Sequence, residues 1–272
     1  TRLAEVSPPV EFSSSFQKRA VHDVIYHLAG AANPIAFPCY RTHAGVAAPV
    51  EYAGYIKRFA MLRLISRREC ERARSIAGGR PPYYFLPLQL NSDAQIRDHS
   101  RFEHMGEAIE YVLESFAQHA PTDTRMVIKN HPLDMGLMNF ARIVRACERR
   151  FDIVGRVEYL EDGDPVLLVG GARGVVTVNS TVGLIALAKD IPTLTLSDPI
   201  YDLPGLTCQW PLDEFWHNCI PPDGNFFERF RRCVMHATQI NGGFYSSAGI
   251  NLAVENSARI LSAERSPLEM LL

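Results

Sequence analysis

The apolar run Gly174-Val175-Val176-Thr177-Val178 is followed directly by the polar stretch Asn179-Ser180-Thr181. An uninterrupted apolar run of this length is typical of a strand buried on both faces of a parallel sheet. The polar stretch can cap a helix, which we expect over Val182 to Lys189. A buried strand, a polar turn and a helix in this order predict an α/β fold.

The same alternation of apolar runs and helical stretches extends on both sides of this stretch. Four further strands are expected, at 83–88, 125–129, 152–157 and 192–196. Helices are expected at 99–118, 135–150, 165–171 and 226–240. The chain therefore predicts a parallel sheet with crossover helices. Residues 1–82 show only patchy periodicity, and Gly78-Gly79 with Pro81-Pro82 predicts a boundary between residues 1–82 and 83–272.

Composition excludes several classes of function. The 28 Lys and Arg against 30 Asp and Glu give a net charge of −2, so we expect no nucleic-acid partner. No apolar run reaches the roughly 20 residues of a membrane-spanning helix. The six cysteines form no C-x-x-C pair, which favours reduced thiols in the cytoplasm. The first residue is Thr1 and no signal peptide follows, which indicates a piece of a longer cytoplasmic protein.

Polar clusters follow three of the expected strands, where open parallel sheets bind ligands. The first holds two amides and a carboxylate, Gln89, Gln95 and Asp93. A loop carboxylate often caps a helix, and that alternative stays open for Asp93. The flanking glutamines favour a catalytic role.

The second cluster offers a cation and an imidazole, Lys129 and His131, before Pro132. Since Pro132 cannot continue the strand, these side chains are expected at the sheet rim, where they suit a phosphate. A structural hydrogen-bonding role for His131 is the alternative.

The third cluster is Asn179, Ser180 and Thr181, with Gly183 behind it. Hydroxyls and free backbone N–H groups at a helix start can cradle a phosphate, which the small Gly183 would approach closely. Plain N-capping explains Ser180 equally well. Asp162-Gly163-Asp164 resembles a metal-holding D-x-D motif, but its place before Pro165 favours a helix cap, so no metal is expected.

Taken in order, Gln89-x-x-x-Asp93-x-Gln95, Lys129-x-His131-Pro132 and Asn179-Ser180-Thr181-Val182-Gly183 resemble the bacterial β-Kdo transferases of the capsule polysaccharide synthesis family, the KpsS/KpsC type. The similarity is greater to the KpsS side. Three further stretches look like this family: 172–177, 200–207 and 240–245.

This resemblance implies a GT-B-like architecture of Rossmann-type halves, with a short or incomplete first half. Residues 1–82 would be a partial acceptor-side region, and residues 83–272 a Rossmann-like domain that binds a nucleotide sugar. It further implies a retaining glycosyltransferase with CMP-Kdo as donor and no cofactor. The nucleotide would be bound by Lys129, His131, Pro132, Asn179, Ser180, Thr181 and Gly183.

In the same reading, Asp93 attacks the anomeric carbon, and Gln89 and Gln95 orient it or the sugar carboxylate; a general-base role for Asp93 stays open. The implied acceptor is a lysophosphatidylglycerol-like glycolipid or a Kdo linker, reached from the cytoplasm with peripheral contact to the inner membrane and to capsule-assembly proteins. Three alternatives remain. They are a transferase for another CMP-sugar such as sialic acid, a non-catalytic assembly or export partner, and a binding module for another nucleotide.

Overall fold

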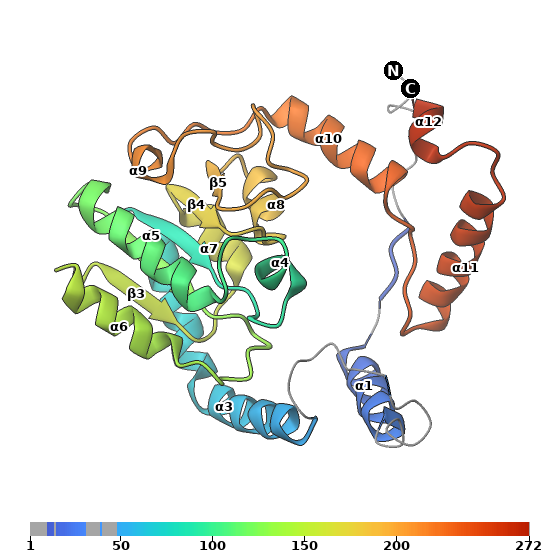
Figure 1. Cartoon of the computed structure of the whole chain (residues 1–272), viewed down its shortest axis with the longest axis horizontal. Coiled ribbons are helices and arrows are strands. Elements are labelled where there is room, and N and C mark those ends of the chain that lie inside the picture. Colours follow the sequence, from blue (N-terminus) through green and yellow to red (C-terminus); the bar gives the residue numbers. More distant parts are fainter. Residues whose placement is uncertain (1–9, 14, 31–38, 40–47, 272) are drawn as a thin grey trace. The chain divides into compact units, whose positions relative to one another are not determined.

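Contacts within the chain divide it into two units, which we call unit 1 (residues 1–43 and 228–272) and unit 2 (residues 44–227). The computed structural model describes residues 10–13, 15–30, 39 and 48–271 (Figure 1). Unit 2 contains the sheet and all of the predicted site residues. The boundary expected after residue 82 falls inside unit 2. The long helix at residues 48–78 packs with the sheet and so belongs to the same unit.

Unit 2 is built on a five-stranded sheet in the order β3-β2-β1-β4-β5, with every pair parallel. The strands are β1 (Tyr83–Pro87), β2 (Arg125–Lys129), β3 (Val157–Leu160), β4 (Gly174–Thr177) and β5 (Thr193–Thr195). This order, with β1 in the centre and the chain returning to it for β4, is that of a Rossmann-type sheet. The predicted α/β class, parallel sheet and crossover helices are confirmed.

Helices cover both faces of the sheet. Successive strand residues point to opposite faces, so each strand contributes side chains to two cores. Tyr84 and Leu86 of β1 pack in one core with α5 (Met105–His119), α6 (Phe140–Arg150) and α9 (Leu212–Phe215). Tyr83 and Phe85 pack in a second core with α3 (Ala48–Gly78), α7 (Pro165–Gly171) and α8 (Val182–Leu187). Figure 1 shows α5 and α6 side by side over the strands. The result is a three-layer α/β/α unit.

The helix α3 has 31 residues and was not predicted. Polar contacts fix it beside the edge strand β3: Arg72 pairs with Glu158 at 2.9 Å, and Ser66 Oγ donates to Asp162 at 2.6 Å. Ala73 is its fully buried residue in the second core. Among the described residues that precede Tyr83 there is no strand. The regular elements in the described part of residues 1–82 are therefore helices.

The largest differences from the predicted element boundaries are at the starts of β3, α5 and α6. The strand expected at 152–157 is wrong, because Asp152 and Gly155 have φ of 54° and 83° and form a turn, and β3 begins only at Val157. The helix α5 begins at Met105 instead of residue 99, because His104 Nδ1 caps it by accepting from Glu107 N at 3.2 Å. Asn139 likewise starts α6 later than expected.

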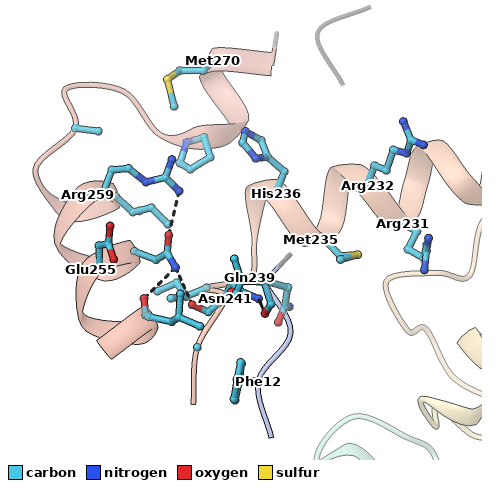
Figure 2. A pocket seen from close by; sticks show the side chains of 18 of the residues that line it. Phe12, Arg231, Arg232, Met235, His236, Gln239, Asn241, Glu255, Arg259 and Met270 are labelled. Carbon is cyan, nitrogen blue, oxygen red and sulfur yellow. Dashed lines mark hydrogen bonds between the residues drawn. The ribbon is translucent and has the colours of Figure 1, made fainter. Parts of the chain in front are cut away.

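Unit 1 is helical in its described part. It contains α1 (Phe16–Gly30), most of α10 (Gly224–Ala237), α11 (Ser247–Leu261) and α12 (Pro267–Leu271). A cavity of about 1320 Å³ lies between α10, α11 and α12. Figure 2 shows the side chains that line it, among them the labelled Arg231, His236 and Arg259. None of the described helices has the length and apolar character needed to cross a bilayer.

Candidate functional site

The three predicted clusters follow β1, β2 and β4, which are neighbours in the sheet. Register pairs Pro87 with Lys129 and Phe85 with Val175, so these strands end at one edge. Because the strands are parallel, the topology brings Gln89, Lys129 and Asn179 to the same carboxyl edge. None of the predicted residues lines the larger cavity of unit 1, so volume does not identify the candidate site.

Two amides join the ends of β1 and β4. Gln89 Nε2 donates to Asn179 Oδ1 at 2.9 Å, and the backbone N–H of Asn179 donates to Gln89 Oε1 at 3.2 Å. Both side chains are buried. Asn179 Nδ2 also donates to the carbonyl of Gln95 at 2.7 Å. These buried, satisfied amides hold the first and third clusters together.

Asp93 is the N-cap of the short helix α4 (Ala94–Arg97). Its Oδ1 accepts from the backbone N–H of Gln95 at 3.0 Å, which is the capping role left open by the sequence. The side chain is half-buried, and Oδ2 accepts no hydrogen bond from the residues that the structure describes. Gln95 itself is exposed. The cap fixes Asp93 while leaving one carboxylate oxygen available.

His131 lies between opposite charges. Burial, and then the nearby Lys129, lower its pKa below the usual value, while Asp134 and Asp93 act in the opposite direction. The backbone N–H of Leu133 donates to His131 Nδ1 at 3.1 Å, so Nε2 is the ring nitrogen left for a ligand. Asp93 and His131 therefore share one electrostatic environment at the sheet edge.

Lys129 is more deeply buried than a rim position predicts. Its exposed fraction is 5%, and Nζ donates to the carbonyl of Asn130 at 3.0 Å. Burial lowers its pKa, and Asp162 is the largest influence in the other direction. Lys129 thus interacts electrostatically with both His131 and Asp162, whereas Pro132 is exposed.

A buried network behind His131 was missed by the sequence analysis. Asn130 Nδ2 donates to Asp134 at 3.2 Å and to Glu161 at 3.1 Å, and its Oδ1 accepts from the His131 N–H at 2.7 Å. Arg58 of α3 is buried and forms an ion pair with Glu161. This network fixes the backbone that carries His131. No local signal reveals it, since Arg58 and Glu161 are 103 residues apart.

The third cluster forms a tight turn into α8. Ser180 Oγ accepts from the Val182 N–H at 3.2 Å, one residue before Thr181, which is the N-cap position of α8. The Ser180 carbonyl accepts from the Tyr201 hydroxyl at 2.5 Å, and a Cβ at Gly183 would lie 2.5 Å from that hydroxyl oxygen. Gly183 therefore makes room for Tyr201. Thr181 is exposed and its side chain caps no N–H, so its hydroxyl is free for a ligand.

The D-x-D stretch has the structural role that the sequence favours. Asp164 Oδ1 accepts from the Val166 N–H at 2.8 Å and caps α7, with Pro165 in the first turn. Asp162 accepts from Ser66 of α3 and from the Gly163 N–H at 2.8 Å. Both carboxylates are used to join α3, β3 and α7.

The fold and these clusters define an α/β protein of the Rossmann type with a polar site at the carboxyl edge of its sheet. The chain belongs to the capsule polysaccharide biosynthesis protein family, which it matches over residues 1–245. The predicted family resemblance is thereby confirmed.

Curated proteins similar to this chain also carry capsule polysaccharide names. The chain is 35% identical over 249 residues to the capsule polysaccharide modification protein LipB of Neisseria meningitidis serogroup B, covering 89% of this chain and 58% of LipB. It is 31% identical over 243 residues to the capsule polysaccharide export protein KpsS of Escherichia coli, covering 88% and 62%. The chain thus spans about three-fifths of the length of these curated relatives.

Among solved structures, the β-Kdo 2,7 transferase KpsC of Thermosulfurimonas dismutans aligns with 66% of this chain and 59% of its own length. Its sequence is 20% identical and the TM-score is 0.39.

Proposed function

We propose that this chain is the donor-binding part of a glycosyltransferase that moves Kdo from CMP-Kdo to an acceptor in capsule synthesis. The observation that carries the proposal is that Asp93, His131 and the exposed Thr181 follow the neighbouring strands β1, β2 and β4 at one carboxyl edge of the sheet. A carboxylate, an imidazole and a hydroxyl from three strand ends suit a sugar phosphate. Membership in the capsule polysaccharide family supports the choice of a sugar substrate.

In the proposed reaction, the phosphate of CMP is bound by His131 Nε2–H and by Thr181. The free oxygen of Asp93 attacks the anomeric carbon, and the bond from that carbon to the phosphate oxygen breaks, releasing CMP. An acceptor hydroxyl then displaces Asp93 and loses its proton to water. Two inversions give net retention. The buried Lys129 adds positive charge behind His131, which opposes the negative charge that develops on CMP.

The acceptor and the cellular location belong to the whole protein. By the family resemblance, we propose a lysophosphatidylglycerol-like glycolipid or a Kdo linker as acceptor, with transfer on the cytoplasmic side and peripheral contact to the inner membrane. Since the chain spans about three-fifths of its relatives, donor binding and donor cleavage are the activities to test first.

The test is calorimetric titration with CMP, using UMP and GMP as controls, on the wild-type chain and on His131→Ala. We expect selective binding of CMP that is weakened at least tenfold in His131→Ala, because the variant lacks the Nε2–H donor. His217→Ala is the matched control, since it removes an exposed imidazole that belongs to none of the three clusters. Equal binding of all three nucleotides would contradict the proposal, as would an unchanged affinity of a folded His131→Ala.

One name favours a second candidate function. The E. coli relative is described as an export protein, which favours a non-catalytic partner in capsule assembly or export. Release of CMP from CMP-Kdo distinguishes the two, and CMP–sialic acid as competitor distinguishes Kdo from another CMP-sugar. A catalytic chain releases CMP, whereas an assembly partner leaves the donor intact.

A further inference from the structure

A second pocket lies in unit 2 beyond the carboxyl end of β5; we call it the β5 pocket. It has a volume of about 640 Å³ and is lined by the segment after β5, by the loop before α5 and by the residues that lead into α9. None of the predicted site residues lines it. Of the family-like stretches in the sequence, 200–207 contributes Asp202 to it, so the pocket lies outside the predicted site residues but touches that stretch.

The β5 pocket adjoins the candidate site. Thr195 at the end of β5 is paired in register with Thr177, two residues before Asn179. The carbonyl of His99, a pocket residue, accepts from Asn179 Nδ2 at 3.5 Å and from the hydroxyl of Ser197. A ligand that lies along the carboxyl edge from β1 to β4 would reach this pocket next.

The pocket offers flat rings to a ligand. Trp210 is 51% exposed and Tyr111 is 36% exposed, although both side chains are large and apolar. Arg101 lies with its guanidinium carbon 4.1 Å from the centre of the Tyr111 ring, a cation–π contact that holds it at the pocket. Exposed aromatic faces of this kind stack on nucleobases.

Its polar groups are available for hydrogen bonds. Thr195 Oγ1 is buried and has no hydrogen-bond partner in the described part of the chain, which is costly unless a ligand supplies one. The Arg101 guanidinium and the Asp198 carboxylate form no ion pair with the residues that the structure describes. The pocket thus presents a donor, an acceptor and a hydroxyl around a flat apolar surface.

We infer that the β5 pocket binds the nucleoside part of the donor, with the base against Trp210 and with Asp198 and Thr195 bonded to the base edge or the ribose hydroxyls. The inference rests on the proposed function, since it gives that donor its base subsite. Three strand spacings of about 4.8 Å separate β5 from β2. The base of one extended donor would then lie against Trp210, and its phosphate and sugar would lie further along the edge, at Thr181, Asp93 and His131.

The two tryptophans of the chain make the inference testable by fluorescence. Trp216 is fully buried and donates to Ser115 Oγ at 2.8 Å, so it is a fixed reference, whereas Trp210 is exposed in the pocket. We expect CMP and cytidine, which lacks the phosphate, to change the emission saturably. Trp210→Phe should abolish that change while calorimetric affinity for CMP stays within about threefold, because a ring still stacks.

Loss of the ring or of the polar groups should weaken binding. We expect Trp210→Ala to lower the affinity for CMP by about tenfold or more. Thr195→Val and Asp198→Ala should lower it as well. The matched control is Phe244→Ala, which removes an exposed ring, 81% exposed, outside the pocket.

The outcomes separate the subsite from the proposed function. Wild-type affinity for CMP in Trp210→Ala, Thr195→Val and Asp198→Ala, with loss in His131→Ala, overturns the subsite and leaves the donor proposal intact. Binding of cytidine that depends on Trp210, without release of CMP from CMP-Kdo, supports the subsite and overturns the transferase. An emission that no nucleoside or nucleotide changes also overturns the subsite.

Discussion

Two acidic loops of unit 2 leave the same edge of one sheet and differ in what surrounds them. We call residues 88–93 the β1 loop and residues 161–164 the β3 loop. In the β3 loop every carboxylate has a partner on another element or caps a helix. In the β1 loop, Asp93 accepts from the Gln95 N–H of its own turn and has no ion pair or hydrogen bond to another element within the described part of the chain. Carboxylates that follow strand ends of one sheet thus anchor the structure in the β3 loop, whereas the proposal assigns Asp93 of the β1 loop to the chemistry.

The largest expected effect is that of Asp93→Asn in the β1 loop. Turnover of CMP-Kdo should fall by about a thousandfold or more, since an amide cannot attack the anomeric carbon. Asparagine caps helices as well as aspartate does, so the unfolding free energy should stay nearly constant. Release of CMP and urea unfolding measure the two quantities. Near-normal turnover by the folded variant would contradict a chemical role for Asp93 and so for the β1 loop.

In the β3 loop the expected effect is on stability. Arg58→Ala should lower the unfolding free energy by about 3 kcal/mol, because Glu161 then keeps a charge without its buried partner. Arg67→Ala is the matched control on the same helix, because the ion pair of Arg67 with Glu71 is exposed and should contribute under about 0.5 kcal/mol. Urea unfolding measures both. Equal effects would mean that the pair with Glu161 is no anchor.

A smaller effect is expected for the cap of the β3 loop. Asp164→Ala should lower the unfolding free energy by about 1 kcal/mol, and Asp164→Asn should retain the cap. Turnover of CMP-Kdo should change less than about twofold in both variants. A loss of turnover comparable to that of Asp93→Asn would assign the D-x-D stretch to the chemistry.

The smallest expected effect concerns pH. Since burial lowers the pKa of His131, the unfolded chain takes up a proton near the usual value of about 6.5 while the folded chain does not. The unfolding free energy should therefore fall as the pH is lowered through 6.5, and His131→Gln should lose that part of the slope. The control His217→Gln removes an exposed imidazole outside the site. The same slope in the wild type and in His131→Gln would contradict the assignment.

The sheet was predictable because its strands are short apolar runs bounded by turns, as in Gly174-Val175-Val176-Thr177. The turn at Asp152 was misread, because Ile153 and Val154 are apolar although the backbone turns there. The helix α3 was missed because it has no pronounced apolar stripe: Ala73 packs in the second core, and polar contacts to β3 hold the rest of the helix.

The candidate site was predictable only at the strand ends, where sequence position and topology agree. Asp93 and His131 lie where the motifs put them, and their roles stay a prediction. Arg58 and Trp210 could not be identified from neighbouring residues, because their contacts are with residues distant in the sequence. Lys129 was predicted as a site residue, but its burial was not, because a lysine at a strand end is expected to be exposed.

The hydrogen bonds between Gln89 and Asn179 limit how these two positions can change in evolution. Gln89 Nε2 donates to the Asn179 side chain, and Gln89 Oε1 accepts from the Asn179 backbone N–H, both in a buried place. A change at one position therefore leaves an unpaired donor or acceptor at the other. Positions 89 and 179 should therefore vary together among descendants of this sequence. In a library randomised at both positions, the surviving members are expected to be matched pairs, with single replacements depleted.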